Sequence, residues 1–219
     1  ISAPGTPRLA VQIVTWNSAA VIDACLESLL GQERRDLLEV IVVDNASRDD
    51  SAERAAGWLA RGLAGEVVRE AENRGFCGGM NRAIARGRGD LVLFLNPDAT
   101  LPAKFVGDAV ALADALPSDV GIVAPRILLR DGRIDSAGLT IDRLCRGWDR
   151  GYGEAAEGRF EREEEVFGAT GAVALLRRAM LDDVAIDGRA LDENIFAYCD
   201  DVDLAWRAWL RGWRCLYAP

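Results

Sequence analysis

The first half of the chain alternates short apolar runs with amphipathic segments, and this alternation restricts the fold more than any other feature. β-rich runs occur at 9–14, 40–43, 67–68 and 91–95, and helix-like segments at 19–30, 50–61 and 79–86 lie between them. The runs at 40–43 and 91–95 are nearly continuous, which is typical of parallel strands covered by helices on both faces. The sequence therefore predicts an α/β protein with a doubly wound, mostly parallel sheet and helices on both faces.

In the second half of the chain the regular strand–helix alternation ends, which predicts a mixed arrangement of strands and helices. A helix is expected over 104–116, a strand over 120–129 with a turn at 130–133, and further strands over 172–176 and 214–217. The segment 145–165 is rich in Gly, Glu and Arg and is expected to be a long loop. A last helix is expected over 200–211. Its predicted buried stripe consists of Val202, Ala205, Trp206, Trp209 and Leu210.

Two local signals concern the starts of helices. Ser47, with Asp50 three residues later, matches a capping box and predicts the start of the second helix. The glycine cluster at 75–79 is expected to precede the third helix. Its small residues would let the backbone approach either a diphosphate or a neighbouring strand.

The chain contains no histidine, which excludes every mechanism that needs an imidazole from these residues. Ser-His-Asp and Cys-His nucleophiles and histidine-based zinc sites are therefore excluded, and carboxylates remain for acid–base work or metal binding. The net charge of −9 argues against a nucleic acid as partner. The five cysteines are scattered and include no CxxC pair, so reduced thiols and a cytoplasmic location are expected.

The length of 219 residues, with 50% hydrophobic content, fits one compact domain. We expect residues 1–8 to be a disordered or processed end and residues 9–219 to form the domain. The sequence lacks an apolar run of about 18 residues, so no membrane-spanning segment is predicted.

Polar clusters directly follow three predicted strands, at 15–17, 44–47 and 96–98. Each alone has an ordinary explanation as turn or helix-cap chemistry. Together they predict a nucleotide site, because the carboxyl ends of parallel strands meet at one edge of the sheet. Neither GxGxxG nor GxxxxGK[ST] occurs, which disfavours a dinucleotide fold and excludes a P-loop. Asp98, a strand-end carboxylate without a nearby Lys, suits Mg²⁺ or Mn²⁺ shared with substrate phosphates.

Four segments resemble, in their order and spacing, motifs of glycosyltransferase family 2, and within it the rhamnosyltransferase-like branch. They are VTWNSAAVIDACLESL, VIVVDNASRDDS, NRGFCGGMNRAIARGRGDLVLFLNPDATL and LDENIFAYCDDVDLAWRAWLRGWRCLYAP. The resemblance covers residues 9–219 apart from 145–165. It implies a GT-A fold, with residues 9–100 as the nucleotide-sugar-binding half and 101–219 as the mixed half that binds the acceptor and carries the catalytic base.

The resemblance also implies roles for individual residues. Thr15 and Asp44 would bind a pyrimidine base, with Asp44 accepting from the ring N–H. Residues 96–98 stand in the place of the family's DxD metal motif, with Asn96 replacing the first Asp and Asp98 binding the metal. The whole predicted nucleotide-sugar site comprises Thr15, Asn17, Asp44, Asn73, Arg74, Asn81, Asn96 and Asp98.

The catalytic base is expected in an acidic pair at the start of the last helix. The resemblance assigns the role to Asp201, with Asp200 as second choice. The alternative is that both carboxylates serve only the helix N-terminus, where acids are favoured. Asp203 is expected to be a first-turn charge or a partner of Arg207.

The resemblance thus implies an inverting, metal-assisted glycosyltransferase that uses Mg²⁺ or Mn²⁺. The donor would be a dTDP- or UDP-sugar, with rhamnose as one candidate sugar. The acceptor would be a saccharide or lipid-linked glycan of the cell envelope, with at most peripheral contact at the inner face of the membrane. Related enzymes continue past 214–217 into a segment that carries a His, so truncation at the C-terminus is also expected.

Two other readings remain open. The first is a catalytically idle nucleotide- or saccharide-binding domain of a larger protein, which Asn96 and the absent histidine favour. The second is a nucleotidyltransferase, which usually carries a Gly-rich signature with a basic residue near its N-terminus. The only Lys of this chain is Lys104.

Overall fold

The computed structural model describes residues 7–219, so residues 1–6 of the predicted end segment lie outside the described residues. Pro7 is buried, and the Arg8 guanidinium pairs with the carboxylates of Asp90 and Asp114. The described chain is therefore packed from its first residues. Among residues 7–219, no helix combines the length and apolar character that a bilayer crossing needs.

The centre of the fold is an eight-stranded mixed sheet with the order β10-β12-β5-β11-β4-β1-β2-β3. Four parallel strands form one half: β1 (Leu9–Thr15), β2 (Leu38–Asp44), β3 (Gly65–Arg69) and β4 (Leu91–Leu95). The other half contains β5 (Val120–Pro125), β10 (Glu164–Val166), β11 (Val173–Arg177) and β12 (Arg214–Ala218). β11 is antiparallel to both β4 and β5, and β10 is antiparallel to β12. The predicted doubly wound, mostly parallel sheet with a mixed second half is thereby confirmed.

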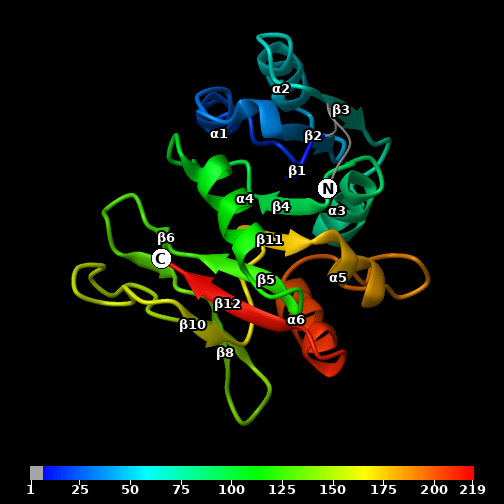
Figure 1. The fold of residues 1–219 in the computed structure, drawn as a ribbon. Coiled ribbons are helices and arrows are strands. Elements are labelled where there is room, and N and C mark those ends of the chain that lie inside the picture. Colours follow the sequence, from blue (N-terminus) through cyan, green and yellow to red (C-terminus); the bar gives the residue numbers. More distant parts are fainter. Residues whose placement is uncertain (1–6) are drawn as a thin grey trace.

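Helices cover both faces of this sheet (Figure 1). One face carries α1 (Ile22–Leu30), α2 (Ser51–Leu59) and α4 (Phe105–Ala115), whose buried residues join Leu9, Val11 and Ile13 of β1 in one core. The opposite face carries α3 (Gly75–Ile84), α5 (Arg178–Asp183) and α6 (Asp200–Leu210). Burial from both sides explains why β4 is apolar throughout and why the central residues 40–43 of β2 are apolar.

Two small hairpins extend the mixed half beyond the predicted elements. The predicted strand at 120–129 is divided into β5 and β6 (Ile127–Leu128), and β6 pairs with β7 (Ile134–Ser136) around the predicted turn. β8 (Leu139–Ile141) pairs with β9 (Gly147–Asp149). The expected long loop at 145–165 was therefore wrong in part, since it contains β9 and most of β10. A three-residue strand offers too few residues for an alternating pattern to be visible in sequence.

The last helix is rotated relative to its prediction. Its buried residues are Asp200, Leu204, Ala205 and Ala208, whereas the side chains of Trp209 and Leu210 are 65% and 74% exposed. Close approach explains the rotation, because a Cβ on Gly168 would lie 2.6 Å from the Cβ of Ala205. Only small side chains fit between helix and chain at that distance. The same rotation turns Asp200 into the interior.

The two helix-start predictions were also wrong. α2 begins at Ser51 with Asp50 in the cap position, and no side-chain capping hydrogen bond forms there. The Ser47 backbone N–H instead donates to the Asp44 carboxylate. The glycine cluster lies inside α3 rather than before it. A Cβ on Gly79 would stand 2.7 Å from Cγ1 of Val14, so this glycine lets α3 pack closely on β1.

Two consecutive arginines anchor the end of β11 to helices on opposite faces. The Arg177 guanidinium donates to the carbonyls of Ala113 and Leu116 at the end of α4. The Arg178 guanidinium donates to the carbonyl of Ile84 at the end of α3, and to those of Gly87 and Gly89 beyond it. Cationic donors satisfy the free carbonyls of helix C-termini. β11 is thereby held at its carboxyl end, opposite the edge where the site lies.

Candidate active site

The carboxyl ends of β1 and β2 place two buried polar side chains next to each other. Thr15 and Asp44 are register partners on these parallel strands, and their side chains are 0% and 5% exposed. Thr15 Oγ1 and Asp44 Oδ1 have no hydrogen-bond partner in the described part of the chain. Buried polar atoms are nearly always paired, so these two unpartnered atoms make the carboxyl ends of β1 and β2 a candidate ligand site.

A neighbouring residue, Asn45, connects this strand end to the loop before α3. Its Oδ1 accepts from the Arg74 backbone N–H at 3.2 Å, and its Nδ2 donates to the Gly75 carbonyl at 2.8 Å. Asn73 Oδ1 accepts from the Gly75 N–H at 2.9 Å. Asn73 and Arg74 are thus attached to the strand end at Asp44, and their contact with the nucleotide stays a prediction. Asn45 was not predicted to have a role, although it lies within the polar cluster at 44–47.

Asn17 lies beside the same edge in a left-handed conformation with φ of 53°. Its Oδ1 accepts from the Arg48 backbone N–H at 2.8 Å, and its own N–H donates to Ser47 Oγ at 2.9 Å. Asn17 therefore connects the β1 and β2 loops, and its neighbour Trp16 is 56% exposed.

The end of β4 carries the predicted metal-binding segment. The Asn96 backbone N–H donates to the Ala172 carbonyl at 2.8 Å, which attaches this turn to the start of β11. Asp98 is exposed, and its negative charge adds to burial in raising the pKa of Asp135 on β7. Within residues 7–219 no group of three or more His, Cys, Asp or Glu side chains is arranged to hold a metal. One exposed carboxylate at a strand end can ligate a hard cation only together with oxygens from a ligand.

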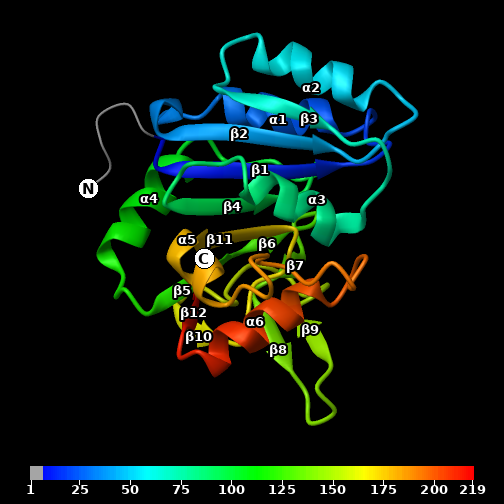
Figure 2. The ribbon, with the colours of Figure 1, turned by 90° about the vertical axis from the view of Figure 1, so that its right-hand side faces the viewer.

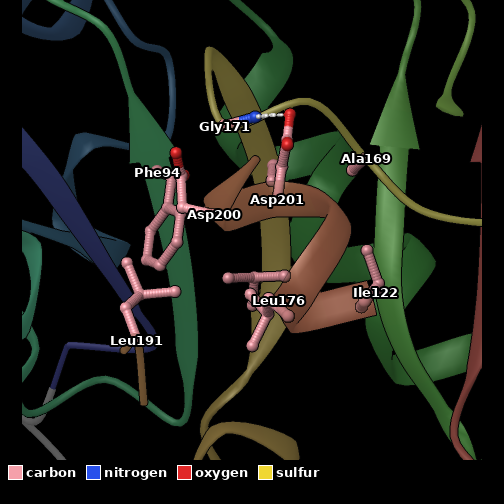
Figure 3. Close-up of a pocket in the computed structure, with 10 residues that line it drawn as sticks. Phe94, Ile122, Ala169, Gly171, Leu176, Leu191, Asp200 and Asp201 are labelled. Carbon is pink, nitrogen blue, oxygen red and sulfur yellow. Dashed lines mark hydrogen bonds between the residues drawn. The ribbon is translucent and has the colours of Figure 1, made fainter. Parts of the chain in front are cut away.

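Asp200 and Asp201 begin α6 and lie over a small apolar pocket, which includes Phe94, Leu176 and Leu191 (Figure 3). Burial raises the pKa of Asp200 to about 6, with the charge of Asp201 as the next cause. Burial also raises the pKa of Asp201, against the opposing effect of backbone hydrogen bonds. Asp201 Oδ1 accepts from its neighbour Val202 at 2.8 Å, and Oδ2 accepts from Gly171 at 3.4 Å.

Two further carboxylates were not predicted from the sequence: Asp149, which is coupled to Asp201, and Asp135, which is coupled to Asp149 and Asp98. Burial raises the pKa of Asp149, and the charges of Asp201 and Asp135 raise it further, while a hydrogen bond with Ser136 lowers it. Asp135 lies on β7 and Asp149 ends β9. No sequence signal could have found them, because both lie on three-residue strands far along the chain from the other site residues.

Asn81 occupies a different place from the other predicted donor residues. Its Nδ2 donates to the Leu191 carbonyl at 2.8 Å and its Oδ1 accepts from the Leu191 N–H at 2.9 Å. Nδ2 also lies 3.2 Å from Glu193 Oε1. The amide therefore attaches α3 to the segment that precedes the Asp200–Asp201 pair. Asp203 pairs with Arg207 at 2.7 Å, as expected.

Comparisons with known proteins agree with this arrangement. The model of the family described as Glycosyl transferase family 2 matches residues 10–185, so the chain belongs to that family. The match ends before α6 and so does not include Asp200 or Asp201.

Two relatives illustrate the extent of sequence similarity. The chain is 28% identical over 225 residues to the protein y4gI of Sinorhizobium fredii, covering 98% of this chain and 24% of that protein. It is 30% identical over 145 residues to the PGL/p-HBAD biosynthesis glycosyltransferase of Mycobacterium tuberculosis, covering 63% of this chain and 54% of that enzyme. The chain thus spans between about a quarter and about half of these relatives.

Solved structures share the fold. The mannosyltransferase PcManGT of Pyrobaculum calidifontis, in complex with GDP-Man and Mn²⁺, is 24% identical with a TM-score of 0.71, over 98% of this chain and 55% of that chain. S. aureus TarS 1-349 in complex with UDP is 19% identical with a TM-score of 0.70, over 97% of this chain and 58% of that chain. These similarities establish a GT-A glycosyltransferase fold. The rhamnosyltransferase-like branch stays a prediction.

Proposed function

We propose that this chain is the catalytic domain of an inverting glycosyltransferase. It transfers a sugar, with rhamnose as one candidate, from a pyrimidine nucleoside diphosphate to a hydroxyl of a saccharide or lipid-linked glycan. The observation that carries the proposal is the pair of buried, unpartnered atoms Thr15 Oγ1 and Asp44 Oδ1 at adjacent strand ends. Membership of glycosyl transferase family 2 supports the reaction class.

A pyrimidine base fits the chemistry of this pair. Uracil and thymine present a ring N–H beside ring carbonyls, so the N–H can donate to Asp44 Oδ1 while a carbonyl accepts from the Thr15 hydroxyl. An unsatisfied buried polar group costs roughly 1–3 kcal/mol, which is the free energy that a bound base would recover at each atom. Asn45 supports the site by bonding the backbone of Arg74 and Gly75, and Asn73 in turn accepts from the Gly75 N–H.

A divalent cation fits the end of β4. Asp98 would hold Mg²⁺ or Mn²⁺ through its exposed carboxylate, with the remaining ligands supplied by diphosphate and water. Such an ion, when bound, neutralises negative charge on the leaving nucleoside diphosphate. Asn96, two residues before Asp98, supplies a neutral amide, so the metal contribution of the chain rests on Asp98.

Asp201 acts as general base in this proposal. Its carboxylate is oriented by the N–H groups of Val202 and Gly171, and burial makes it more basic than an exposed Asp. It takes the proton of the acceptor hydroxyl as that oxygen forms its bond to the anomeric carbon. The bond from that carbon to the diphosphate oxygen breaks on the opposite face, and the nucleoside diphosphate leaves with the electron pair, so the configuration inverts.

The remaining donor-site residues act by positioning. Asn17 holds the loops after β1 and β2 together, and Asn81 holds the segment before the acidic pair. We place the reaction in the cytoplasm, since all five cysteines are free thiols, with at most peripheral contact with a membrane-borne acceptor.

Calorimetric titration with UDP, dTDP, GDP and NAD, each with and without Mn²⁺, tests the donor site. We expect a pyrimidine diphosphate to bind in a metal-dependent manner, and the metal dependence to disappear in Asp98→Ala. Thr15→Val keeps the shape of the side chain and removes its hydroxyl, so it should weaken the same titration. Asp36→Ala is the matched control, because Asp36 is an exposed carboxylate just before β2, at the opposite edge of the sheet.

The alternative function is a catalytically idle nucleotide-binding domain, which Asn96 in the place of a metal-binding acid favours. Turnover separates the two functions, because an idle domain binds UDP or dTDP without releasing it from a nucleotide sugar. Preference for GDP or NAD would contradict the pyrimidine assignment. Absence of binding by all four nucleotides would contradict the donor site.

A further inference from the structure

Tyr198 is the most exposed large apolar side chain in the described part of the molecule. Its side chain is 87% exposed, and Phe196, two residues earlier, is 58% exposed. Both lie in the segment that runs beside α3 into α6, drawn in orange in Figure 2. Exposed aromatics are common singly, so this exposure needs a second observation before it indicates a site.

The backbone supplies that observation. Tyr198 and Cys199 have φ values of 67° and 63°, in the left-handed region that bulky residues rarely adopt. Strain of this kind persists only where the surrounding structure imposes it, and it gathers at functional sites. A glycine or asparagine would adopt the same backbone with less strain, so a tyrosine here points to a use for the ring.

Contacts on both sides hold the strained residues in place. Upstream, the Phe196 carbonyl accepts from the Phe76 N–H at 2.8 Å, and a Cβ on Gly75 would lie 2.3 Å from the same oxygen. Downstream, the Cys199 carbonyl accepts from the Asp203 N–H at 2.9 Å in the first turn of α6. The tyrosine ring is therefore presented from a fixed backbone rather than from a free loop.

The position of Tyr198 relates it to the acceptor rather than to the nucleotide. Phe196 packs on Gly75, next to the residues that hold the nucleotide, whereas Tyr198 lies two residues nearer to the base Asp201. The Tyr198 backbone also acts on Asp200, because it lowers the pKa of that carboxyl against the larger effect of burial.

We propose that Tyr198 is the stacking platform for the ring of the acceptor sugar, an inference that rests on the proposed transferase function. Its exposed ring would cover the C–H face of a pyranose or furanose while the hydroxyl under attack faces Asp201. Aromatic rings offer a large apolar contact with few rotatable bonds, so little conformational freedom is lost on binding. Tyr198 is thus a specificity-determining residue that selects acceptors with an open C–H face.

Three variants separate the ring from the backbone. Tyr198→Phe keeps the ring, Tyr198→Asn removes it while accepting the left-handed backbone, and Trp209→Ala removes a similarly exposed aromatic from the outer side of α6. Saturation-transfer NMR with methyl glycosides of rhamnose, glucose, mannose and galactofuranose reports sugar contact without turnover. Titration with UDP and Mn²⁺ reports the donor site independently.

We expect Tyr198→Asn to bind the best-binding glycoside with an affinity lower by between about two- and tenfold than the parent chain. Tyr198→Phe and Trp209→Ala should bind this glycoside with the affinity of the parent chain. UDP affinity should stay the same in all variants. Equal glycoside affinity in Tyr198→Asn and the parent would overturn the proposal, as would the absence of saturation transfer from the parent to all four glycosides. Loss of UDP-sugar affinity alone in Tyr198→Asn would assign the ring to the donor sugar instead. Failure of UDP to bind the parent chain would contradict the proposed donor site. The glycoside measurement would still test the role of Tyr198 independently.

Discussion

Replacing Asp200 by Asn should stabilise the fold at neutral pH and abolish part of its pH dependence. Asp200 is 8% exposed and lies against the apolar pocket under the start of α6. Burial and the neighbouring charge of Asp201 raise its pKa from 3.8 to about 6. The folded chain therefore favours the protonated form of Asp200, and ionisation of this carboxyl destabilises the fold.

The magnitude follows from the size of this shift. About two pKa units at 1.36 kcal/mol each amount to roughly 3 kcal/mol. Because the folded state binds the proton more tightly than the unfolded state, this stabilisation is complete below about pH 4 and is lost as the pH rises through about 6. Asn is uncharged at every pH, so the variant does not lose this stabilisation as the pH rises. The gap between variant and parent should therefore grow from near zero at pH 4 to about 3 kcal/mol at pH 8.

Urea unfolding at intervals between pH 4 and pH 8 measures this gap. Asp182→Asn serves as the matched control, because it makes the same substitution at an exposed carboxylate that buries no charge. A constant gap for Asp200→Asn across the range, or a variant less stable than the parent at pH 8, would refute the reasoning.

Three other substitutions test the base and the packing. Asp201→Asn should lower kcat by about 10²–10⁴-fold with UDP affinity unchanged, measured as nucleotide release, and normal turnover would remove Asp201 from the role of base. Gln12→Met should raise the free energy of unfolding, measured in urea, by about 1–3 kcal/mol. Gln12 is fully buried and both of its amide atoms are unpartnered among the described residues. A variant less stable than the parent would contradict this expectation. Gly79→Ala should lower the free energy of unfolding by about 1–3 kcal/mol, because the new Cβ would lie 2.7 Å from Val14 Cγ1. Greater protection of α3 from hydrogen exchange in the variant would contradict this clash.

The sequence predicted the parallel half of the sheet well because its central strands are buried on both faces. Burial on both faces favours a continuous apolar run, and β4 has the bounds that its apolar run predicts. The mixed half was harder to predict. Its hairpin strands β6 to β9 are two or three residues long, and their pairing depends on partners brought together by the chain rather than on local pattern.

The rotation of α6 shows how tertiary packing overrides periodicity. Trp206, Trp209 and Leu210 form an apolar stripe at helical spacing, and hydrophobicity alone predicts that this stripe is buried. The space beside Gly168 admits only small residues, so Ala205 is buried as predicted, whereas Leu204 and Ala208 are buried in place of Trp209 and Leu210. Which apolar face is buried was decided by the distance between the helix and the chain at Gly168, a quantity that the sequence does not contain.

For the site, the sequence alone determined which polar residues follow which strands. Thr15, Asp44 and Asp98 gather at one edge because parallel strands bring their carboxyl ends together. Only the tertiary structure decided that Thr15 and Asp44 are buried side by side with atoms left unpartnered, and that Asp149 is coupled to Asp201. The physical reason is that burial and electrostatic coupling depend on distances between segments remote in sequence, whereas a strand-end motif depends only on its neighbours along the chain.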